Sequence, residues 1–366
     1  MRIALDGSDL AADRFEGPSV YAGELLPRLS RLLRDRGHEV TTYLPASPRG
    51  VTIVGEIRVV PGSPFWTQRF FAAALRRDRP DVLFMPIQML PLIRPRTMKT
   101  VAVVHDLEFI HYPATYTLAN RALLLFFTRH AVRNATQLIA VSQYTKDDVV
   151  STYGRSPTDI TVVHHGVAQE QFQNAEEREG IRERYQLPER YVLFVGALQP
   201  RKNIVGLITA FEELKRSEPA VHLVFAGGGE WKETQILARI ETSSVRNSIH
   251  LLRRVPRDDL AALYSMAAAF VLPSFSEGFG MPVLEAMAAG TPVITSNTSS
   301  LPEVVGNAAV LVDPSDPSAM ASAILRILRD SSLRQDMVAK GHVRASHFTW
   351  DRAAEQTAEV IEKAGA

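Results

Sequence analysis

The sequence predicts an α/β protein made of two doubly wound domains, each a parallel sheet with helices on both faces. Short apolar runs alternate with longer helix-like stretches along the chain, which is typical of a parallel sheet that is buried on both sides. The alternation stops in a polar segment rich in Glu, Gln and Arg, residues 166–190, and then starts again. The length of 366 residues also exceeds one ordinary hydrophobic core and suits two.

The expected elements form two sets, one on each side of that polar segment. In the first set, strands are expected at residues 2–5, 40–44, 57–60, 82–85, 101–105, 137–142 and 160–163. Helices of this set are expected at residues 19–35 and 119–134. In the second set, strands are expected at residues 191–196, 222–227, 249–252, 269–272, 292–295 and 309–312. The tail, residues 348–364, has the apolar spacing of an amphipathic helix.

The composition is that of an ordinary globular protein, with 46% hydrophobic and 22% charged residues. The absence of cysteine excludes disulfides, thiolate metal sites and cysteine nucleophiles. The N-terminus turns polar after one short apolar run, and no apolar run approaches the roughly 20 residues of a membrane span. We therefore expect a cytoplasmic protein. The net charge of +1 argues neither for nor against nucleic acid, and no nucleic-acid partner is expected.

One part of the chain is unevenly charged. Between Arg58 and Lys99 the basic residues outnumber the acids, Asp78 and Asp81, and several aromatic residues lie among them. The favoured interpretation is that the aromatics belong to the core and the arginines to a solvated face. The alternative is a surface that meets anionic lipid, with the protein held peripherally at the inner face of a membrane.

The candidate site centres on residues 269–290, which predict a strand, a Gly-rich turn and a helix. Pro282 suits the first turn of a helix, where a missing N–H costs nothing, and Gly290 suits its end. The amide groups at such a helix start are unpaired and bind phosphate. Gly278 and Gly280 lie just before it, as expected where the backbone must approach a ligand closely.

Two glutamates flank this helix start. Glu277 lies in the turn and Glu285 in the early helix, and carboxylates accept hydrogen bonds from sugar and ribose hydroxyls. Simpler alternatives are compensation of the helix dipole by Glu285 and a solvated loop position for Glu277. A site with N–H groups that bind phosphate in the middle, and a carboxylate that accepts from hydroxyl groups at each end, matches the shape of a sugar nucleotide.

Two further places directly follow expected strands and carry polar side chains, and a third candidate, a glycine, precedes the first expected helix. Arg201 and Lys202 come after residues 191–196, where a guanidinium and an ammonium group can bind phosphate, although such a pair is often solvated surface. His105, next to Asp106, ends another strand and can bind a hydroxyl or be purely structural. Gly17 precedes the first helix, for which Ser19 is an alternative N-cap.

The segment SEGFGMPVLEAMAAGTPVITS, with Glu277 and Glu285 at its E-x7-E spacing, resembles the signature of retaining glycosyltransferases of family 4. The resemblance implies the GT-B fold: two Rossmann-like domains facing a central cleft, with a C-terminal helix that crosses back to the first domain. The corresponding domains are an acceptor-side domain, residues 1–170 with the helix at 347–366, and a nucleotide-sugar-binding domain, residues 171–346.

The resemblance also implies roles for individual residues. Glu277, His105, Arg201 and Lys202 take the catalytic positions, with Arg201 and Lys202 on the diphosphate and His105 at the sugar and acceptor side. The donor-binding positions are Gly17, Gly278, Phe279, Gly280, Met281, Pro282, Val283, Glu285, Arg254 and Val255. Two of these depart from the family pattern, because Ser19 stands beside Gly17 where a second glycine is usual, and Arg254 stands where an aromatic residue usually precedes the base-binding position.

The resemblance finally implies a reaction. The segment HDLEFIHYPATYT resembles the mannosyltransferase-like branch of the family, which indicates transfer of mannose from GDP-mannose with retention of configuration. The alternatives are a UDP-sugar donor and a GT-B nucleotide-sugar epimerase. No cofactor and no metal are expected. A lipid-linked sugar, a polysaccharide or a small glycoside would each suit as acceptor.

Overall fold

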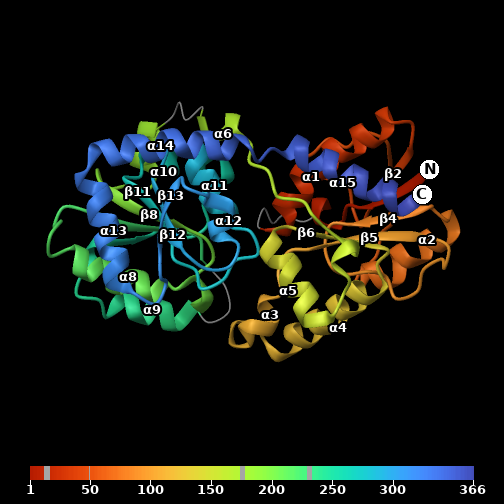
Figure 1. Cartoon of the computed structure of the whole chain (residues 1–366), viewed down its shortest axis with the longest axis horizontal. Helices are drawn as coiled ribbons and strands as arrows, with labels where there is room; N and C mark the ends of the chain where they lie inside the picture. Colours follow the sequence, from red (N-terminus) through yellow and green to blue (C-terminus); the bar gives the residue numbers. More distant parts are fainter. Residues whose placement is uncertain (12–16, 49, 174–177, 229–232) are drawn as a thin grey trace. The chain divides into compact units, whose positions relative to one another are not determined.

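The computed structural model describes residues 1–11, 17–48, 50–173, 178–228 and 233–366 (Figure 1). Part of the polar segment expected as a linker, residues 174–177, lies outside these ranges. The chain divides into two compact units. The first unit consists of Met1–Ile110, Leu118–Gly166 and Thr349–Ala366. The second unit consists of His111–Thr117 and Val167–Phe348.

The first unit contains a seven-stranded sheet in which every neighbouring pair is parallel. The strand order is β3-β2-β1-β4-β5-β6-β7. The strands are β1 (Arg2–Asp6), β2 (Glu39–Leu44), β3 (Glu56–Val59), β4 (Val82–Met85), β5 (Lys99–Val104), β6 (Gln137–Ala140) and β7 (Ile160–Val162). Its central strands are almost entirely buried, which confirms the prediction from their continuous apolar runs.

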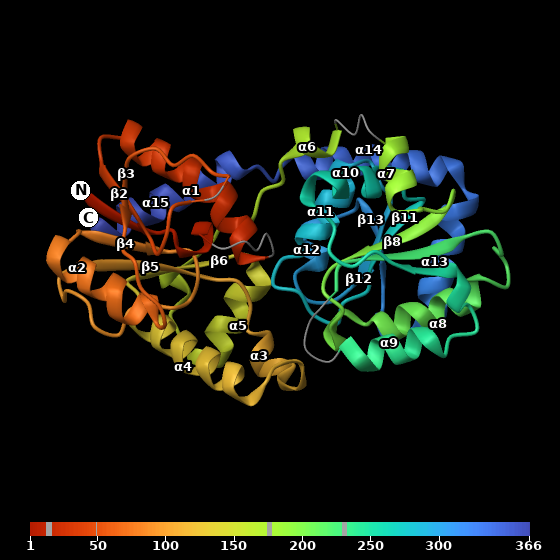
Figure 2. The same cartoon turned by 180° about the vertical axis from the view of Figure 1, so that it is seen from behind.

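The helices of the first unit come from both ends of the chain. They are α1 (Pro18–Asp35), α2 (Ala72–Asp78), α3 (Glu108–His111, whose last residue belongs to the second unit), α4 (Leu118–Asn134), α5 (Gln143–Tyr153) and α15 (Trp350–Gly365). The C-terminal helix α15 lies beside α1 and packs on β5 and β4 (Figures 1 and 2). The expected return of the tail helix to the first domain is therefore confirmed.

The second unit repeats the architecture with a six-stranded parallel sheet, in the order β10-β9-β8-β11-β12-β13. Its strands are β8 (Tyr191–Val195), β9 (His222–Ala226), β10 (Ile249–Leu251), β11 (Ala269–Leu272), β12 (Val293–Ser296) and β13 (Ala309–Val312). Its helices are α6 (Gln169–Gln173), α7 (Arg178–Arg184), α8 (Ile204–Leu214), α9 (Glu233–Glu241), α10 (Arg257–Met266), α11 (Met281–Ala288), α12 (Leu301–Val305), α13 (Pro317–Arg329) and α14 (Ser331–Ser346).

The observed boundaries differ slightly from the expected ones, and glycine explains several of the differences. The apolar runs place Gly196 and Gly227 inside strands, but both have positive φ, of 147° and 122°, and stand just past the strand ends. The first helix begins at Pro18 with Gly17 as its N-cap. The alternative N-cap at Ser19 is therefore wrong, because Ser19 lies inside the first turn.

The strand order of each sheet reverses direction at one point, and this determines where a ligand can bind. The reversal lies between β1 and β4 in the first sheet and between β8 and β11 in the second. In doubly wound folds, ligands bind outside the carboxyl ends of the strands at such a point. No helix among the described residues is long and apolar enough to cross a membrane.

Candidate active site

Three of the predicted site residues meet at the reversal point of the second sheet. Lys202 and Arg201 follow β8, and Glu277 follows the adjacent strand β11. The Lys202 Nζ atom lies 2.6 Å from Glu277 Oε1, and Arg201 Nη1 lies 3.3 Å from Glu277 Oε2. Both cations thus converge on one carboxylate, across 75 residues of sequence for Lys202. The sequence predicts one site for these residues but does not indicate that they pair with each other.

The cations keep the buried carboxylate ionised. Burial by itself raises the pKa of Glu277, but the charges of Lys202 and Arg201 and hydrogen bonds from Lys202 and Ser274 lower it to about 2. The Ser274 hydroxyl donates to Glu277 Oε1 at 2.6 Å. At neutral pH the cluster therefore carries two positive charges and one negative charge, and its excess positive charge favours an anion such as a diphosphate.

Backbone hydrogen bonds hold the two loops of this cluster together. The Phe275 N–H donates to the Arg201 carbonyl oxygen at 2.9 Å, and Arg201 Nη1 donates to the Ser276 carbonyl oxygen at 2.8 Å. From the loop after β12, Ser299 Oγ accepts from the Glu277 N–H and Ser300 Oγ donates to the Glu277 carbonyl oxygen. The position of Glu277 is thus set by three loops at the carboxyl edge of one sheet.

The helix start that is expected to bind phosphate follows directly. Gly280 is the N-cap of α11, has φ of 97°, and provides no side-chain cap. The positive φ favours glycine here, and a Cβ atom at Gly280 would lie 2.7 Å from Leu301 Cδ2, so that the Leu301 side chain would have to move. Pro282 has no N–H, and the Val283 N–H donates to the Gly280 carbonyl oxygen at 3.1 Å. The Met281 N–H, at the positive end of the helix, is therefore the first-turn amide that remains for an anion.

The side chains around this start have different roles. Val283 is buried, and Phe279 is buried with its ring edge-to-face against Phe348, 5.9 Å between centroids. Their side chains therefore belong to the core of the second unit, and only their backbone remains for a donor. Met281 and Pro282 are partly exposed, whereas Gly278 is buried.

Glu285 lies one turn into α11 and is held by a neighbouring helix. The Tyr264 hydroxyl, from α10, donates to Glu285 Oε2 at 3.0 Å. Burial and the nearby charge of Glu285 raise the pKa of Tyr264 well above its usual value, so the tyrosine remains a donor. The bond fixes the orientation of the Glu285 carboxylate, which suits a group that must accept from a hydroxyl.

The predicted base-binding residues lie on the loop after β10. Arg254 is exposed and Val255 is half-buried. The loop is joined to the neighbouring one by a hydrogen bond of 2.7 Å from the Gly227 N–H to the Arg253 carbonyl oxygen. A Cβ atom at Gly227 would lie 2.3 Å from the Gly196 carbonyl oxygen. The loops after β8, β9 and β10 are therefore packed backbone to backbone at the same sheet edge.

In the first unit, His105 follows β5 and is partly exposed. Its Nε2 atom lies 2.8 Å from the Pro86 carbonyl oxygen. A carbonyl oxygen can only accept, so Nε2 carries the proton and Nδ1 is an acceptor in the neutral ring. Burial lowers the pKa of His105, against the raising effects of Pro86 and Asp106. A neutral ring with an acceptor nitrogen suits a sugar hydroxyl.

His105 belongs to a cluster of rings in the first unit. Tyr21 stands edge-to-face to it at 4.9 Å between centroids, and His165 lies 5.5 Å away. Trp350, at the start of α15, stacks on His165 at 5.8 Å. These contacts bury His165, and they fix the His105 ring from the side of α1 and α15.

Gly17 precedes α1 with φ of 49°, and a Cβ atom built there would meet nothing within 4 Å. Its conformation rather than crowding favours glycine. The residues just before it, 12–16, lie outside the described ranges.

Sequence reasoning missed Asp6, the last residue of β1 at the reversal point of the first sheet. Its side chain is fully buried, and burial raises its pKa to about 7. Oδ1 accepts from the Ser8 N–H at 2.9 Å, whereas Oδ2 has no partner among the described residues. A carboxylate that titrates near neutrality at this position is a functional candidate. One aspartate in an apolar strand has no spacing that could have revealed it.

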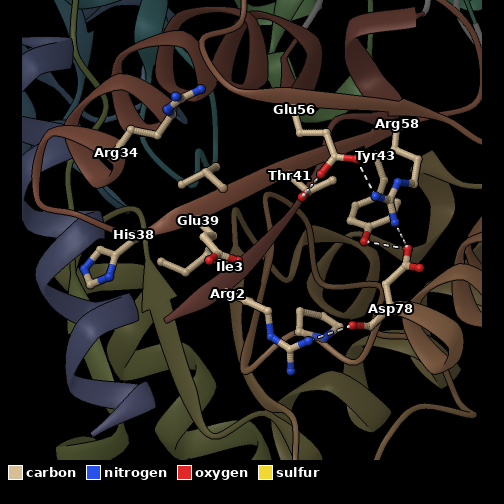
Figure 3. Close-up of a pocket in the computed structure, with 12 residues that line it drawn as sticks. Arg2, Ile3, Arg34, His38, Glu39, Thr41, Tyr43, Glu56, Arg58 and Asp78 are labelled. Carbon is tan, nitrogen blue, oxygen red and sulfur yellow. Dashed lines mark hydrogen bonds and ion pairs between the residues drawn. The ribbon is translucent and has the colours of Figure 1, made fainter.

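A separate cavity of about 580 Å³ lies along β1, β2 and β3 (Figure 3). None of the predicted site residues lines it. Its charged groups are largely engaged with one another: Arg58 pairs with Glu56 and Asp78, and the Tyr43 hydroxyl donates to Asp78 at 2.9 Å. These pairs explain its polar lining without a ligand.

Comparison with known proteins identifies the family. Residues 22–171 match Glycosyltransferase Family 4 and residues 177–344 match Glycosyl transferases group 1. The chain is 32% identical to O-antigen chain mannosyltransferase B of Escherichia coli, over 72% of this chain and 70% of that protein. It is 33% identical to a D-inositol 3-phosphate glycosyltransferase of Salinispora arenicola, over 64% of this chain and 56% of that protein.

Solved structures share the fold. Sucrose-phosphate synthase from Thermosynechococcus elongatus superposes with a TM-score of 0.78 at 22% identity, covering 99% of this chain and 98% of that one. Anabaena HepE in complex with UDP and glucose superposes with a TM-score of 0.76 at 18% identity, covering 99% of this chain and 100% of that one. With both family matches and the E. coli relative, these findings show that the chain belongs to the group 1, family 4 glycosyltransferases and has their two-domain fold.

Proposed function

We propose that this glycosyltransferase moves mannose from GDP-mannose, with retention of configuration, to a hydroxyl group of a glycan or a lipid-linked acceptor. The main support for a nucleotide-sugar donor is the cluster of Arg201, Lys202 and Glu277 just before the start of α11. Support for mannose comes from the relatives, two of which are O-antigen chain mannosyltransferases at 32% and 30% identity.

In this proposal the diphosphate binds the Met281 N–H at the start of α11 together with Arg201 and Lys202. These cations stabilise the negative charge that develops on the departing nucleoside diphosphate, which is the electrostatic task of a metal in other enzymes. Glu285, oriented by Tyr264, accepts from the ribose hydroxyls. Glu277 and the backbone from Gly278 to Met281 hold the donor sugar. The acceptor nitrogen of His105 binds a sugar hydroxyl.

A donor screen tests the proposal. The melting temperature of the protein is measured with GDP-mannose, UDP-glucose and UDP-N-acetylglucosamine, and transfer to a mannose-containing acceptor is then followed by NMR of the anomeric proton. GDP-mannose is expected to stabilise the protein most, and the product is expected to keep the configuration of the donor. Activity is expected to persist in EDTA. Stabilisation by UDP-sugars alone would overturn the choice of GDP-mannose.

A UDP-sugar donor is the second candidate, because the base-binding position departs from the family pattern and does not identify the base. Arg254 is exposed on the loop where the family holds the base, and it stands in place of the usual aromatic residue. A nucleotide-sugar epimerase is distinguished by a different product, because it would release a new nucleotide sugar when no acceptor is present.

A further inference from the structure

Helix α4 of the first unit has apolar and cationic side chains on its solvent-exposed stripe. Ala122, Phe126, Arg129 and Arg133 follow one another at intervals of four, three and four residues, so they form one stripe along the helix. All four are exposed, and Phe126 is 55% exposed. The solvent-facing stripe of a helix on a globular protein is normally polar. Here it is apolar in its first half and cationic in its second.

Other exposed apolar side chains extend this stripe within α4. Leu118, its first residue, is 85% exposed, and Leu123 is exposed beside Phe126. In both views α4 lies along the rim of the first unit (Figures 1 and 2). The helix therefore offers several large apolar side chains that its own unit leaves uncovered.

A loop in contact with the end of α4 carries further exposed apolar residues. Arg94 joins the loop to the end of α4: its Nη1 atom lies 3.3 Å from His130 Nε2, and its Nη2 atom donates to the Asn134 carbonyl oxygen at 3.2 Å. Next to Arg94 in sequence, Ile93 is 63% exposed and Leu92 is also exposed. The loop that carries these two exposed apolar residues is thus held against the C-terminal end of α4.

A third segment is tied to that loop. Gln68 donates to the Leu90 carbonyl oxygen and accepts from the Leu92 N–H. Three residues before Gln68, Phe65 is 66% exposed, whereas the nearby Trp66 and Phe71 are buried. The expectation that the aromatics of this region belong to the core thus holds for Trp66 and Phe71 but not for Phe65. We call the combined set the apolar–basic face: Phe65, Arg69, Leu92, Ile93, Arg96, Leu118, Leu123, Phe126, Arg129 and Arg133.

The charge of this face has one sign. Its four arginines, at positions 69, 96, 129 and 133, are all exposed. The sequence contains no Asp or Glu between Asp81 and Asp106 or between Glu108 and Asp147. Exposed cations in the rest of the chain are often mixed with acids, as in the pairs Arg184–Asp259 and Lys340–Asp336. The face is therefore complementary to an anionic partner that also accepts apolar side chains.

We propose that the apolar–basic face docks on an anionic lipid bilayer. Large apolar side chains that project singly insert into the interfacial region of a bilayer, while arginines pair with anionic headgroups. A second copy of the chain is a poor partner, because a symmetric contact would bring these arginines against themselves. A nucleic acid would use the arginines but leave the leucines in water.

The proposal is independent of the donor assignment, because docking requires neither donor nor acceptor. Its connection with the proposed function is that an acceptor linked to lipid would be presented at such a surface. A failure to transfer mannose would therefore leave the docking result intact, and a failure to dock would leave the donor assignment intact.

Co-sedimentation of the full chain with vesicles tests the proposal. Vesicles of phosphatidylcholine alone are compared with vesicles that also contain phosphatidylglycerol, at low and high salt. Binding is expected only to the anionic vesicles and is expected to weaken at high salt. Two double variants are each expected to reduce the partition coefficient about tenfold or more. The first combines Leu123→Ser with Phe126→Ser, and the second combines Arg129→Gln with Arg133→Gln.

Matched control variants replace exposed apolar and cationic side chains outside the apolar–basic face. Val343→Ser changes an exposed apolar residue of α14, and Arg216→Gln with Arg326→Gln removes two exposed charges from the second unit. The controls are expected to bind vesicles within about twofold of the unmodified chain. Circular dichroism checks that all variants are folded.

Four outcomes would overturn the proposal. The unmodified chain could remain in the supernatant with anionic vesicles, the α4 variants could bind as the controls do, or binding could be equal on neutral vesicles. If sedimentation velocity instead showed self-association that the α4 variants abolish, the face would be a protein–protein contact and the lipid proposal would be wrong.

Discussion

At the scale of single residues, the ion pairs of Glu277 determine how a donor must bind. Lys202 and Arg201 are already paired with this carboxylate. A diphosphate adds a second anion to the cluster, so it shares the two cations with Glu277 or displaces it. Glu277 is ionised while it is paired with these cations, so sharing them with a diphosphate requires no proton transfer. The Glu277 carboxylate thus holds the two cations in position for a second anion.

We predict that Lys202→Met reduces the affinity for nucleoside diphosphate about 10- to 100-fold. The substitution removes one of two cations from a buried site, where charge-assisted hydrogen bonds are worth about 1.5 to 3 kcal/mol. Isothermal titration with GDP and with UDP measures the effect. Lys340→Met is the matched control, because Lys340 is exposed on α14 and forms an ion pair with Asp336. Equal affinities in the two variants would remove Lys202 from the site.

Asp6 leads to a prediction about pH. Burial raises its pKa from the usual value of 3.8 to about 7 in the folded protein, so the folded state holds the proton more tightly than the unfolded chain. This contribution to stability is complete below pH 3.8 and is lost as the pH rises from there through 7. Asp6→Asn mimics the protonated form. It is expected to be more stable than the original chain at pH 8, by up to about 4 kcal/mol, and similar to it near pH 4.

Melting temperatures of both proteins between pH 4 and pH 8, followed by circular dichroism, check this prediction. A difference that stays constant over the whole range would show that Asp6 does not titrate there. If the asparagine variant folds stably but loses transfer at every pH, Asp6 acts on the substrate as well.

These residues also show what sequence can and cannot predict. Glu277, Arg201 and Lys202 are recognisable because each follows an apolar strand and matches a family motif. Their mutual pairing joins positions 75 residues apart, and only the adjacency of β8 and β11 reveals it. Asp6 becomes a candidate only when its complete burial is known, because burial rather than spacing changes its chemistry.

At the scale of elements, α11 shows how a helix start becomes a binding site. Gly280 has φ of 97°, and a Cβ atom there would displace the Leu301 side chain. Because glycine has no side chain, the N-cap provides no side-chain partner for the Met281 N–H. The sequence predicts this helix well, since Pro282 and the apolar residues after it leave few other conformations. It does not reveal that Leu301 closes one side of the turn.

We predict that Gly280→Ala weakens donor binding and destabilises the second unit by about 1 to 3 kcal/mol. The strain arises from the positive φ and from the 2.7 Å approach to Leu301 Cδ2. Gly180→Ala is the matched control, because Gly180 lies in α7, and a Cβ atom there would meet nothing within 4 Å. The control is expected to be neutral or slightly stabilising. Thermal melts and nucleotide titrations of both variants decide the outcome, and equal effects would contradict the prediction.

Strands are the most predictable elements, because apolar runs in a sheet buried on both faces are almost continuous. Their ends are less predictable. Gly196 and Gly227 prolong the apolar runs of β8 and β9, but their positive φ takes them out of the sheet. The close approach of Gly227 to the Gly196 carbonyl oxygen depends on two strands that lie side by side only in the fold.

At the scale of the whole molecule, the first unit is built from both ends of the chain. Helix α15 buries Trp350, Ala354, Ala358 and Ile361, and its Glu362 pairs with Arg36 at 2.8 Å. The second unit is supplied mainly by one continuous segment, Val167–Phe348. The amphipathic tail can be predicted from its spacing, but the surface that receives it cannot, because α1 and α15 lie at opposite ends of the sequence.

We therefore predict that a chain ending at Phe348 loses the first unit and keeps the second. Burying one large apolar side chain contributes about 1.5 to 3 kcal/mol, so Trp350, Val360 and Ile361 together supply an amount comparable to the stability of a whole domain, about 5 to 15 kcal/mol. Limited proteolysis is expected to degrade the truncated chain before residue 166 while a fragment near residues 167–348 persists. Adding a peptide of residues 349–366 in excess is expected to restore protection.

Glu359→Ser, at an exposed position of α15, provides the full-length control and should resist the protease as the original chain does. A truncated chain whose first unit still resisted would show that α15 is dispensable, and the burial of its apolar face would then contribute far less than its area implies.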